Sequence, residues 1–182
     1  MEIRESFIPG CYEIQSFIAP DERGRFVKSF SLPFFEEHHL CTAFAEQVYS
    51  TSHRNVIRGL HFQIPPEECV KLVHCVAGKV TDVVVDLRAG SPTYGKYALF
   101  ELNEEQANEV YVPAGLAHGF YVHSDSATVV YGISRPFSPT CDSGIRWDSA
   151  DIPWPTTTPD VSVKDRNLPP LSSFNSPFLF SS

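Results

Sequence analysis

The chain has 182 residues, 42% of them hydrophobic, and a formal net charge of −8 at pH 7. This length and composition predict one domain over residues 1–182, and no stretch reaches the ~20 apolar residues that a membrane-spanning helix needs. An acidic protein is poorly suited to nucleic acid, whose phosphates attract basic surfaces, so an anionic ligand would require a local cluster of cations.

The N-terminus and the cysteines indicate the compartment. Residues 1–5 lack the basic-then-apolar pattern of a secretory signal. The five cysteines are odd in number, lie far apart and form no C-x-x-C pair, which is typical of a reducing environment. We therefore expect a cytoplasmic protein without a membrane partner.

In chain order, one short helix is followed by a series of strands. Pro33–His39 is the only good helix candidate, with Ser31 as its cap. Short β-branched and aromatic runs between turn residues then predict strands at Ala43–Ser52, Val56–Phe62, Val70–Val76, Val80–Leu87, Tyr97–Leu102, Val110–Val112 and Ala127–Ser134. The turn at Ala77–Lys79 predicts a hairpin between two of them. This spacing favours an all-β barrel or jelly roll with few short helices.

The end of the chain, residues 172–182, is rich in Ser, Phe and Pro and has no periodicity. It predicts an irregular C-terminal tail. Its apolar side chains Phe174, Phe178 and Phe180 favour docking over free solvation.

The first segment with chemical potential is Arg58–Gln63, which places His61 in a strand. Strict alternation would point Arg58 and His61 to opposite faces, but a bulge at Gly59 would turn both toward one cavity. An imidazole is suited to proton transfer near neutral pH, although a single strand histidine is more often structural. Both interpretations stay open at this point.

Other segments are equally ambiguous when taken alone. The cations Arg23, Arg58, Lys71 and Lys164 suit either a diphosphate clamp or ordinary solvated charge. His118, in the turn segment Val112–Phe120, would pair with backbone or a ligand. Tyr131 shares a strand face with Val129 and Ile133, as a core tyrosine would, and Ser162–Arg166 has the pattern of a charged surface turn.

A metal site is the rival chemical interpretation, because barrels of this size often hold metal through histidines and a glutamate. Glu67 follows His61 at a plausible distance, but Gln63 occupies the position of the second histidine of an H-x-H pair. A prearranged metal cage is therefore disfavoured.

Taken together, these segments resemble the dTDP-4-dehydrorhamnose 3,5-epimerase family, from about Phe7 to about Arg166. Asp21–Gly24, Ser91–Lys96 and Gly144–Trp147 add to the pattern. The resemblance implies a jelly-roll (cupin-like) barrel, a homodimer, and a reaction without metal or cofactor. It implies epimerisation at C3, C5 or both of a nucleotide-linked 4-keto-6-deoxyhexose, in deoxysugar biosynthesis for O-antigen or another surface polysaccharide.

The resemblance also implies roles for individual residues. His61 corresponds to the catalytic base, Asp165 to the residue that orients it, and Tyr131 to the acid. The positions that correspond to substrate-binding residues are Arg23, Lys28, Gln47, Arg58, Lys71, His118, Phe137 and Lys164. Side-chain chemistry agrees, since a C4 ketone acidifies the hydrogens at C3 and C5 and a neutral histidine can remove one of them.

Departures from the family pattern concern the nucleotide and the stereocentres. Lys28 replaces a usual glutamate, which favours a CDP-linked over a dTDP-linked sugar, and Gln47–Tyr49 replaces a usual Gln-Asp-Asn. The altered segment Gly132–Phe137 is compatible with inversion at C3 alone. The alternative functions are a metal-dependent cupin enzyme and a non-catalytic sugar-nucleotide binder. Retention of all three catalytic-type residues argues against the latter.

Overall fold

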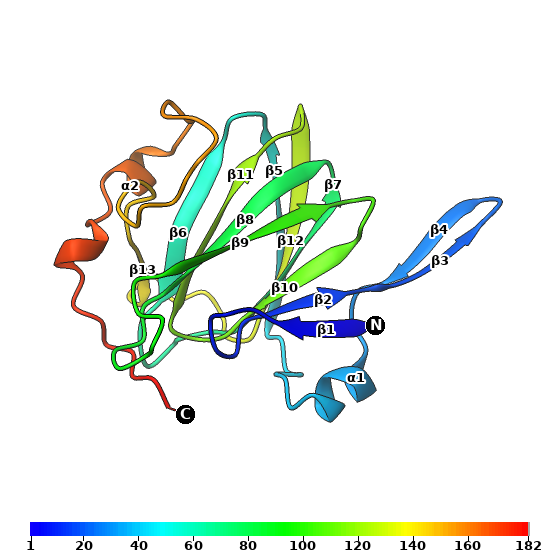
Figure 1. Ribbon diagram of the computed structural model, residues 1–182, viewed down its shortest axis with the longest axis horizontal. Helices are drawn as coiled ribbons and strands as arrows, with labels where there is room; N and C mark the ends of the chain where they lie inside the picture. Colours follow the sequence, from blue (N-terminus) through cyan, green and yellow to red (C-terminus); the bar gives the residue numbers. More distant parts are fainter. Residues whose placement is uncertain (182) are drawn as a thin grey trace.

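Two antiparallel β-sheets pack face to face in the computed structural model, which describes residues 1–181 (Figure 1). The six-stranded sheet has the order β1 (Glu2–Glu5), β2 (Tyr12–Gln15), β10 (Asn108–Val112), β7 (Lys71–Ala77), β12 (Ser126–Ile133) and β5 (Glu46–His53). The five-stranded sheet has the order β13 (Asp142–Gly144), β6 (Ile57–Gln63), β11 (Leu116–Val122), β8 (Lys79–Asp86) and β9 (Tyr97–Asn103). The predicted all-β jelly roll is confirmed.

The remaining elements lie around this sandwich. The strands β3 (Phe17–Asp21) and β4 (Gly24–Lys28) form a hairpin that projects away from the body (Figure 1). The helical elements are short: α1 (Leu32–Glu37), α2 (Val163–Arg166) and the 3₁₀ turn η1 (Leu171–Ser173). No helix within residues 1–181 is long and apolar enough to cross a membrane.

The main core lies between the two sheets, where alternate residues of each strand point inward. Val73 and Val129 of the six-stranded sheet meet Val84 and Phe120 of the five-stranded sheet, and all are buried. A second cluster around Phe35 lies on the outer side of the six-stranded sheet, beneath α1. Both sheets therefore bury one face in a shared core, and the largest described hollow beside His61 lies along β6 and the segment that contains α2.

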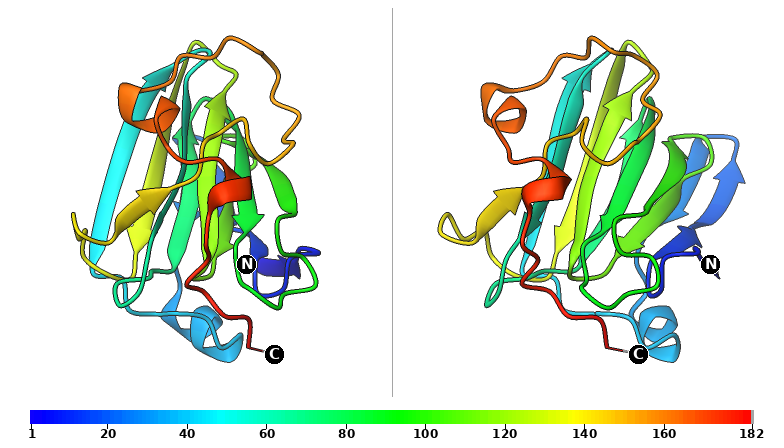
Figure 2. Two further views of the ribbon diagram at one scale, coloured as in Figure 1. Left: turned by 90° about the vertical axis from the view of Figure 1, so that its left-hand side faces the viewer. Right: turned by 60° about the vertical axis from the view of Figure 1, so that its left-hand side comes forward.

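The C-terminal tail runs across the outer face of the five-stranded sheet, as Figure 2 shows in orange and red. The ring of Phe62 lies 5.2 Å from that of Phe174 and 5.7 Å from that of Phe178, which is only 5% exposed. The backbone of Phe180 donates to Ala89 O at 3.0 Å. The tail is irregular and docked, as expected for residues 172–181; Ser182 lies outside the described residues.

The hairpin predicted at Ala77–Lys79 is wrong. β7 pairs with β10 and β12, whereas β8 pairs with β9 and β11, so the turn at Gly78 (φ +80°) crosses from one sheet to the other. The reason is that Val73 and Val84 bury their side chains in the same core, and each strand must face that core from its own sheet.

The other sequence expectations differ in detail. The expected strands are all present with shifted ends, but β1 to β4 and β13, which are short or partly exposed, were not predicted. His118, which was expected at a turn, lies inside the buried strand β11. The helix occupies Leu32–Glu37 in place of Pro33–His39, and Ser31 stands at its N-cap without a side-chain cap hydrogen bond.

Candidate functional site

The bulge expected at Gly59 is present and shapes the site. In the pairing of β6 with β11, His61 lies opposite His118 but Arg58 lies opposite Phe120, so β6 contains one extra residue. Gly59 has φ +134°, and a Cβ there would lie 2.7 Å from Gly119 Cα, so no larger side chain fits. The bulge turns Arg58 and His61 toward the same cavity of about 590 Å³.

His61 forms a hydrogen-bonded pair with Asp165 across 104 residues of sequence, with Nε2 and Oδ1 2.7 Å apart. The His61 side chain is 32% exposed at the cavity, whereas that of Asp165 is only 5% exposed. Asp165 Oδ2 also accepts from Gly59 N at 3.4 Å, and Ser162 Oγ accepts from Asp165 N at 3.0 Å at the start of α2. The carboxylate is therefore held from several sides.

Electrostatics favour an ionised Asp165. Burial acts to raise the pKa of this carboxyl group, but the hydrogen bond and charge of His61, with the bonds from Gly59 and Ser162, outweigh it and lower the pKa below its ordinary value. A carboxylate can only accept hydrogen bonds, so it fixes a proton on Nε2 of His61. The other ring nitrogen, Nδ1, is then free to accept a proton.

Tyr131 lies on the inner face of the other sheet, near His118. It lies on β12 with its ring packed against the main core, 6.0 Å from the ring of His118 and 6.5 Å from that of Phe120. Its hydroxyl is 3.3 Å from Ser50 Oγ of β5. Burial raises the pKa of Tyr131 well above its usual value, so the phenol stays protonated at neutral pH. It can donate a proton but not hold a negative charge for long.

A second histidine–aspartate pair closes the inner end of the site. His118 Nε2 lies 2.7 Å from Asp82 Oδ2, and both side chains are buried. Lys71 Nζ donates to the backbone oxygen of His61 at 3.1 Å. Asp82 was missed by the sequence analysis, although an acidic residue inside the apolar run Val80–Leu87 was a signal that could have revealed it.

Two further cations lie at the open end. Arg58 donates through Nε to Ser52 Oγ at 2.8 Å, and Lys164 of α2 forms an ion pair with Asp142 of β13. Both cations line the same cavity as His61 and Asp165. The structure thus brings together Arg58, His61, Lys71, His118, Tyr131, Lys164 and Asp165 of the predicted site.

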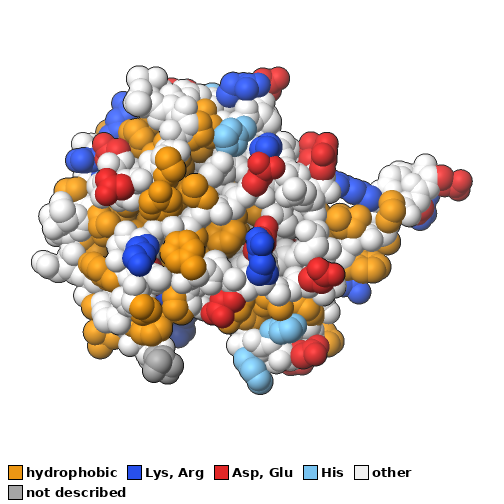
Figure 3. All heavy atoms as spheres, viewed as in Figure 1, with side chains coloured by type: hydrophobic (Ala, Val, Ile, Leu, Met, Phe, Trp, Pro, Cys, Tyr) orange, Lys and Arg blue, Asp and Glu red, His pale blue; other side chains and the backbone are white. Residues whose placement is uncertain are grey.

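The hairpin residues Arg23 and Lys28 do not join this cluster within one chain. The hairpin projects from the side of the body opposite α2 (Figure 1), and the space-filling view shows hydrophobic side chains along it (Figure 3). Arg23 pairs with Asp21 at the hairpin tip, and Lys28 Nζ lies 5.8 Å from the ring centre of Phe17.

Gln47 also lies apart from this cavity within one chain. In the pairing of β5 with β12, Val48 lies opposite Tyr131 and Gln47 lies opposite Gly132. Because side chains alternate between faces, Gln47 points to the outer side of the sheet, where it lines a hollow with Phe44. Phe137 is 60% exposed in a loop that Gln63 holds through Pro136 O and Ser138 N.

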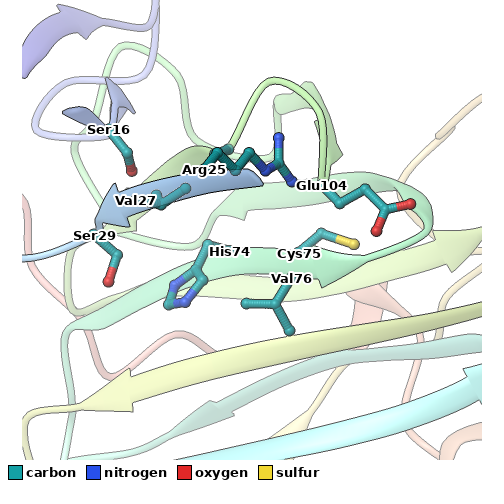
Figure 4. Close-up of a pocket in the computed structure, with 9 residues that line it drawn as sticks. Ser16, Arg25, Val27, Ser29, His74, Cys75, Val76 and Glu104 are labelled. Atoms are coloured by element: carbon teal, nitrogen blue, oxygen red, sulfur yellow. The ribbon is translucent and has the colours of Figure 1, made fainter. Parts of the chain in front are cut away.

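A separate hollow of about 180 Å³ lies between the hairpin and the outer side of the six-stranded sheet, lined by Ser16, Arg25 and His74 among others (Figure 4). Behind it, buried Glu109 accepts from Ser16 Oγ at 2.6 Å, and its Oε2 lies 3.9 Å from His74 Nδ1. Burial raises the pKa of Glu109 to about 8. This cluster is on the opposite side of the sheet from Tyr131.

No group of three or more His, Cys, Asp or Glu side chains within residues 1–181 is arranged to hold a metal ion. Glu67, the third ligand considered from the sequence, contributes its backbone oxygen to Gln63 Nε2 at 2.8 Å.

Comparison with known proteins gives a consistent result. Residues 5–173 match the sequence model of a family described as dTDP-4-dehydrorhamnose 3,5-epimerase. The Shigella flexneri protein of that name is 39% identical over 92% of this chain and 94% of its own length. A dTDP-4-dehydrorhamnose 3-epimerase from Streptomyces niveus is 38% identical over 92% of this chain and 82% of its own.

A solved structure agrees with these sequence matches. The dTDP-6-deoxy-D-glucose-3,5-epimerase of Legionella pneumophila, in complex with dTDP-4-keto-L-rhamnose, superimposes with a TM-score of 0.93 at 33% identity and covers 99% of both chains.

Proposed function

The chain belongs to the dTDP-4-dehydrorhamnose 3,5-epimerase family, and from this membership we propose how its own residues act. It is an isomerase of deoxysugar biosynthesis that epimerises a nucleotide-linked 4-keto-6-deoxyhexose. The relatives do not support the two alternatives raised by the sequence, a metal-dependent barrel enzyme and a non-catalytic binder. The residue roles below are our proposal.

His61 is the base. The C4 ketone acidifies the hydrogen on the neighbouring carbon, and Nδ1 of a neutral His61 removes it to give an enolate. Asp165, held by Gly59 and Ser162, keeps the other proton on Nε2 and stabilises the imidazolium as it forms. The lowered pKa of Asp165 supports this role, because an ionised carboxylate is required.

Tyr131 is the acid that returns a proton to the opposite face of the sugar. One observation supports the proposal: His61 and Tyr131 belong to different sheets, and His118 lies opposite His61 on the neighbouring strand with its ring 6.0 Å from that of Tyr131. A planar enolate between the two sheets would lose a proton to one and gain a proton from the other, which inverts the centre. Because its pKa is raised by burial, Tyr131 carries its proton until the enolate accepts it.

Cations in the cavity bind and stabilise the negative charge of the substrate. Lys71 lies at the closed end beside the His118–Asp82 pair, where its positive charge stabilises a developing enolate oxygen. Arg58 and Lys164 lie at the open end and suit the diphosphate. Phe137, exposed in the loop after β12, provides a ring on which a nucleotide base can stack.

The functional unit is a homodimer in which the hairpin of one subunit reaches the site of the other. Phe17 and Phe26 are exposed on the hairpin and need cover, and an isolated two-stranded hairpin is marginal in water. Arg23 and Lys28 lie on that hairpin, far from the cavity of their own chain. Isologous pairing would also cover exposed strand edges.

The wider setting is also proposed. The chain is a single catalytic domain with its tail docked on the body, and it acts in the cytoplasm on a precursor of O-antigen or another surface polysaccharide. Its acidic charge supports a small anionic substrate and no nucleic-acid partner.

The relatives include enzymes named as 3,5-epimerases and one named as a 3-epimerase, so inversion at C3, C5 or both is tested directly. The purified protein is incubated in deuterated water with dTDP- and CDP-linked 4-keto-6-deoxyhexoses, and NMR follows deuterium at C3 and C5. We expect exchange at C3 at least. No exchange with any of these substrates would refute the function.

A further inference from the structure

Asp82 is the most completely buried ionisable group at the catalytic cavity. It lies on β8 with no exposed surface, inside a sheet whose neighbouring residues Val83 and Val84 are apolar and buried. Its Oδ2 is paired with His118 Nε2, while Oδ1 is buried without a hydrogen-bond partner among residues 1–181. An unpaired carboxylate oxygen in a core costs free energy, so its presence calls for a functional reason.

The charge of Asp82 acts on the groups assigned to the reaction. Burial lowers the pKa of Lys71, and the nearby acids Cys69, Asp82 and Asp142 oppose that shift. Burial raises the pKa of Asp82 itself, against the influence of His118 and then Lys71. After burial and the Ser50 hydrogen bond, the Asp82 charge is the next contribution to the pKa of Tyr131, which it raises. The Asp82 carboxylate thus influences the pKa of both the Lys71 ammonium and the Tyr131 phenol.

We propose that Asp82 is a positioning residue for the epimerisation: its carboxylate keeps a proton on Nε2 of His118 and supports the positive charge of the Lys71 ammonium at the closed end of the cavity. The proposal rests on the proposed function. With that proton fixed on Nε2, Nδ1 is the ring nitrogen of His118 that is left to accept a hydrogen bond.

The physical reason is the charge that develops during the reaction. Proton abstraction creates an enolate in a cavity that is poorly solvated, and fixed positive charge is most effective there when it is already in place. A buried lysine without a nearby acid tends to lose its proton. A buried acid beside Lys71 and His118 keeps the ammonium charged and the imidazole oriented, while Asp165 orients the base from outside the barrel.

The first test uses the protein without substrate. Long-range ¹H–¹⁵N spectra distinguish protonated from unprotonated ring nitrogens, and the His118 signals are assigned by their absence in His118→Gln. We expect Nε2 of His118 to carry a proton from pH 6 to 9 in the wild type. In Asp82→Asn, the amide can donate to Nε2 and move the proton to Nδ1. An unprotonated Nε2 in the wild type would overturn the proposal, whether or not the variant folds.

The second test is the pH profile of kcat. Asp82→Asn should lower kcat by ~10–100-fold, the range seen when a carboxylate partner behind a functional histidine is lost, and should move the alkaline limb by about one pH unit to lower pH. Asp82→Glu, which retains the charge, should keep the limb in place. If Asp82→Asn lowered the melting temperature but left the alkaline limb of the pH profile in place, Asp82 would have a structural role only, and the proposal would be overturned.

A matched control is Glu109→Gln, which replaces another fully buried carboxyl group, on the outer side of the six-stranded sheet, by an amide. It should leave both the His118 spectrum and the pH profile unchanged. If the wild type turned over no 4-keto sugar, the proposed function would fail, while the spectra would still decide which proton Asp82 fixes.

Discussion

His61 and His118 lie directly opposite each other on the adjacent antiparallel strands β6 and β11, and each imidazole is bound through Nε2 to a different aspartate at 2.7 Å. The two pairs differ in access to water. His61 is partly exposed beside the open cavity, whereas His118 is sealed with its partner. One strand pairing thus places a histidine that is open to the cavity next to a histidine that is closed off from water.

Replacing the base should abolish turnover. We expect His61→Asn to lower kcat by ~10²–10⁴-fold and to prevent deuterium incorporation, because a general base typically contributes that much and no other described side chain stands in its place. Deuterium exchange by NMR measures this, with circular dichroism to verify folding. His123→Asn, whose ring binds Thr81 Oγ1 at 2.7 Å outside the cavity, is the matched control and should remain active. Full activity of His61→Asn would exclude His61 as the base.

Replacing the acid should separate proton exchange from inversion. Tyr131→Phe keeps the ring packed against Phe120 but removes the proton donor, so turnover should fall ~10²–10⁴-fold while some deuterium still enters from the face of His61. The products are analysed for both label and configuration. Inverted product formed at the wild-type rate would show that another group reprotonates the sugar.

The dimer can be tested by mixing two inactive proteins. If Arg23 serves the site of the partner, a heterodimer of Arg23→Ala with His61→Asn contains one site in which both residues are intact. Co-expression of the two variants with different affinity tags should therefore restore up to about half of the activity, as one of two sites is complete. If the hairpin served its own chain, no activity would return. Light scattering that finds a monomer at micromolar concentration would also contradict the dimer.

Lys28 offers a test of nucleotide choice. Thymine presents a donor at N3 and cytosine an acceptor, so an ammonium at this position would favour CDP over dTDP substrates by about one to two decades. Comparison of kcat/KM for matched substrates, with wild type and Lys28→Glu, measures the preference. Equal ratios in both proteins would show that Lys28 does not read the base. This comparison is needed because the relatives are named for dTDP-linked substrates, whereas Lys28 favours CDP-linked ones.

Glu109 should make stability depend on pH. The pKa of Glu109 is about 8 in the folded protein against an ordinary value of 4.5, so the folded state retains a proton that the unfolded state releases. The contribution of this group to stability is therefore full below pH 4.5 and is lost as the pH rises to 8. Glu109→Gln should remove that loss. As the pH rises from 5 to 8.5, the free energy of unfolding of this variant should increase relative to that of the wild type by on the order of 1–4 kcal/mol. Denaturant unfolding at both pH values measures the gain, and equal pH dependence would contradict it.

Local pattern determined the fold class and most catalytic positions. Short β-branched runs predicted the strands because side chains alternate on a pleated surface, and Gly59 predicted a bulge because only glycine reaches its backbone conformation without strain. The resemblance of several segments in register indicated His61, Tyr131 and Asp165. His61 and Asp165 line one cavity, and Tyr131 is linked to them through His118, which lies opposite His61.

Other features were decided by contacts between residues far apart in the sequence. Whether the turn at Gly78 makes a hairpin depends on which sheet buries each strand, and the shared core requires a crossover. Gln47 was assigned to the site from a pattern, but the register of β5 against β12 turns it outward. Asp82 emerges only when β8 lies beside β11, 36 residues away, because a hydrogen bond to His118 is a property of two strands and not of either sequence alone.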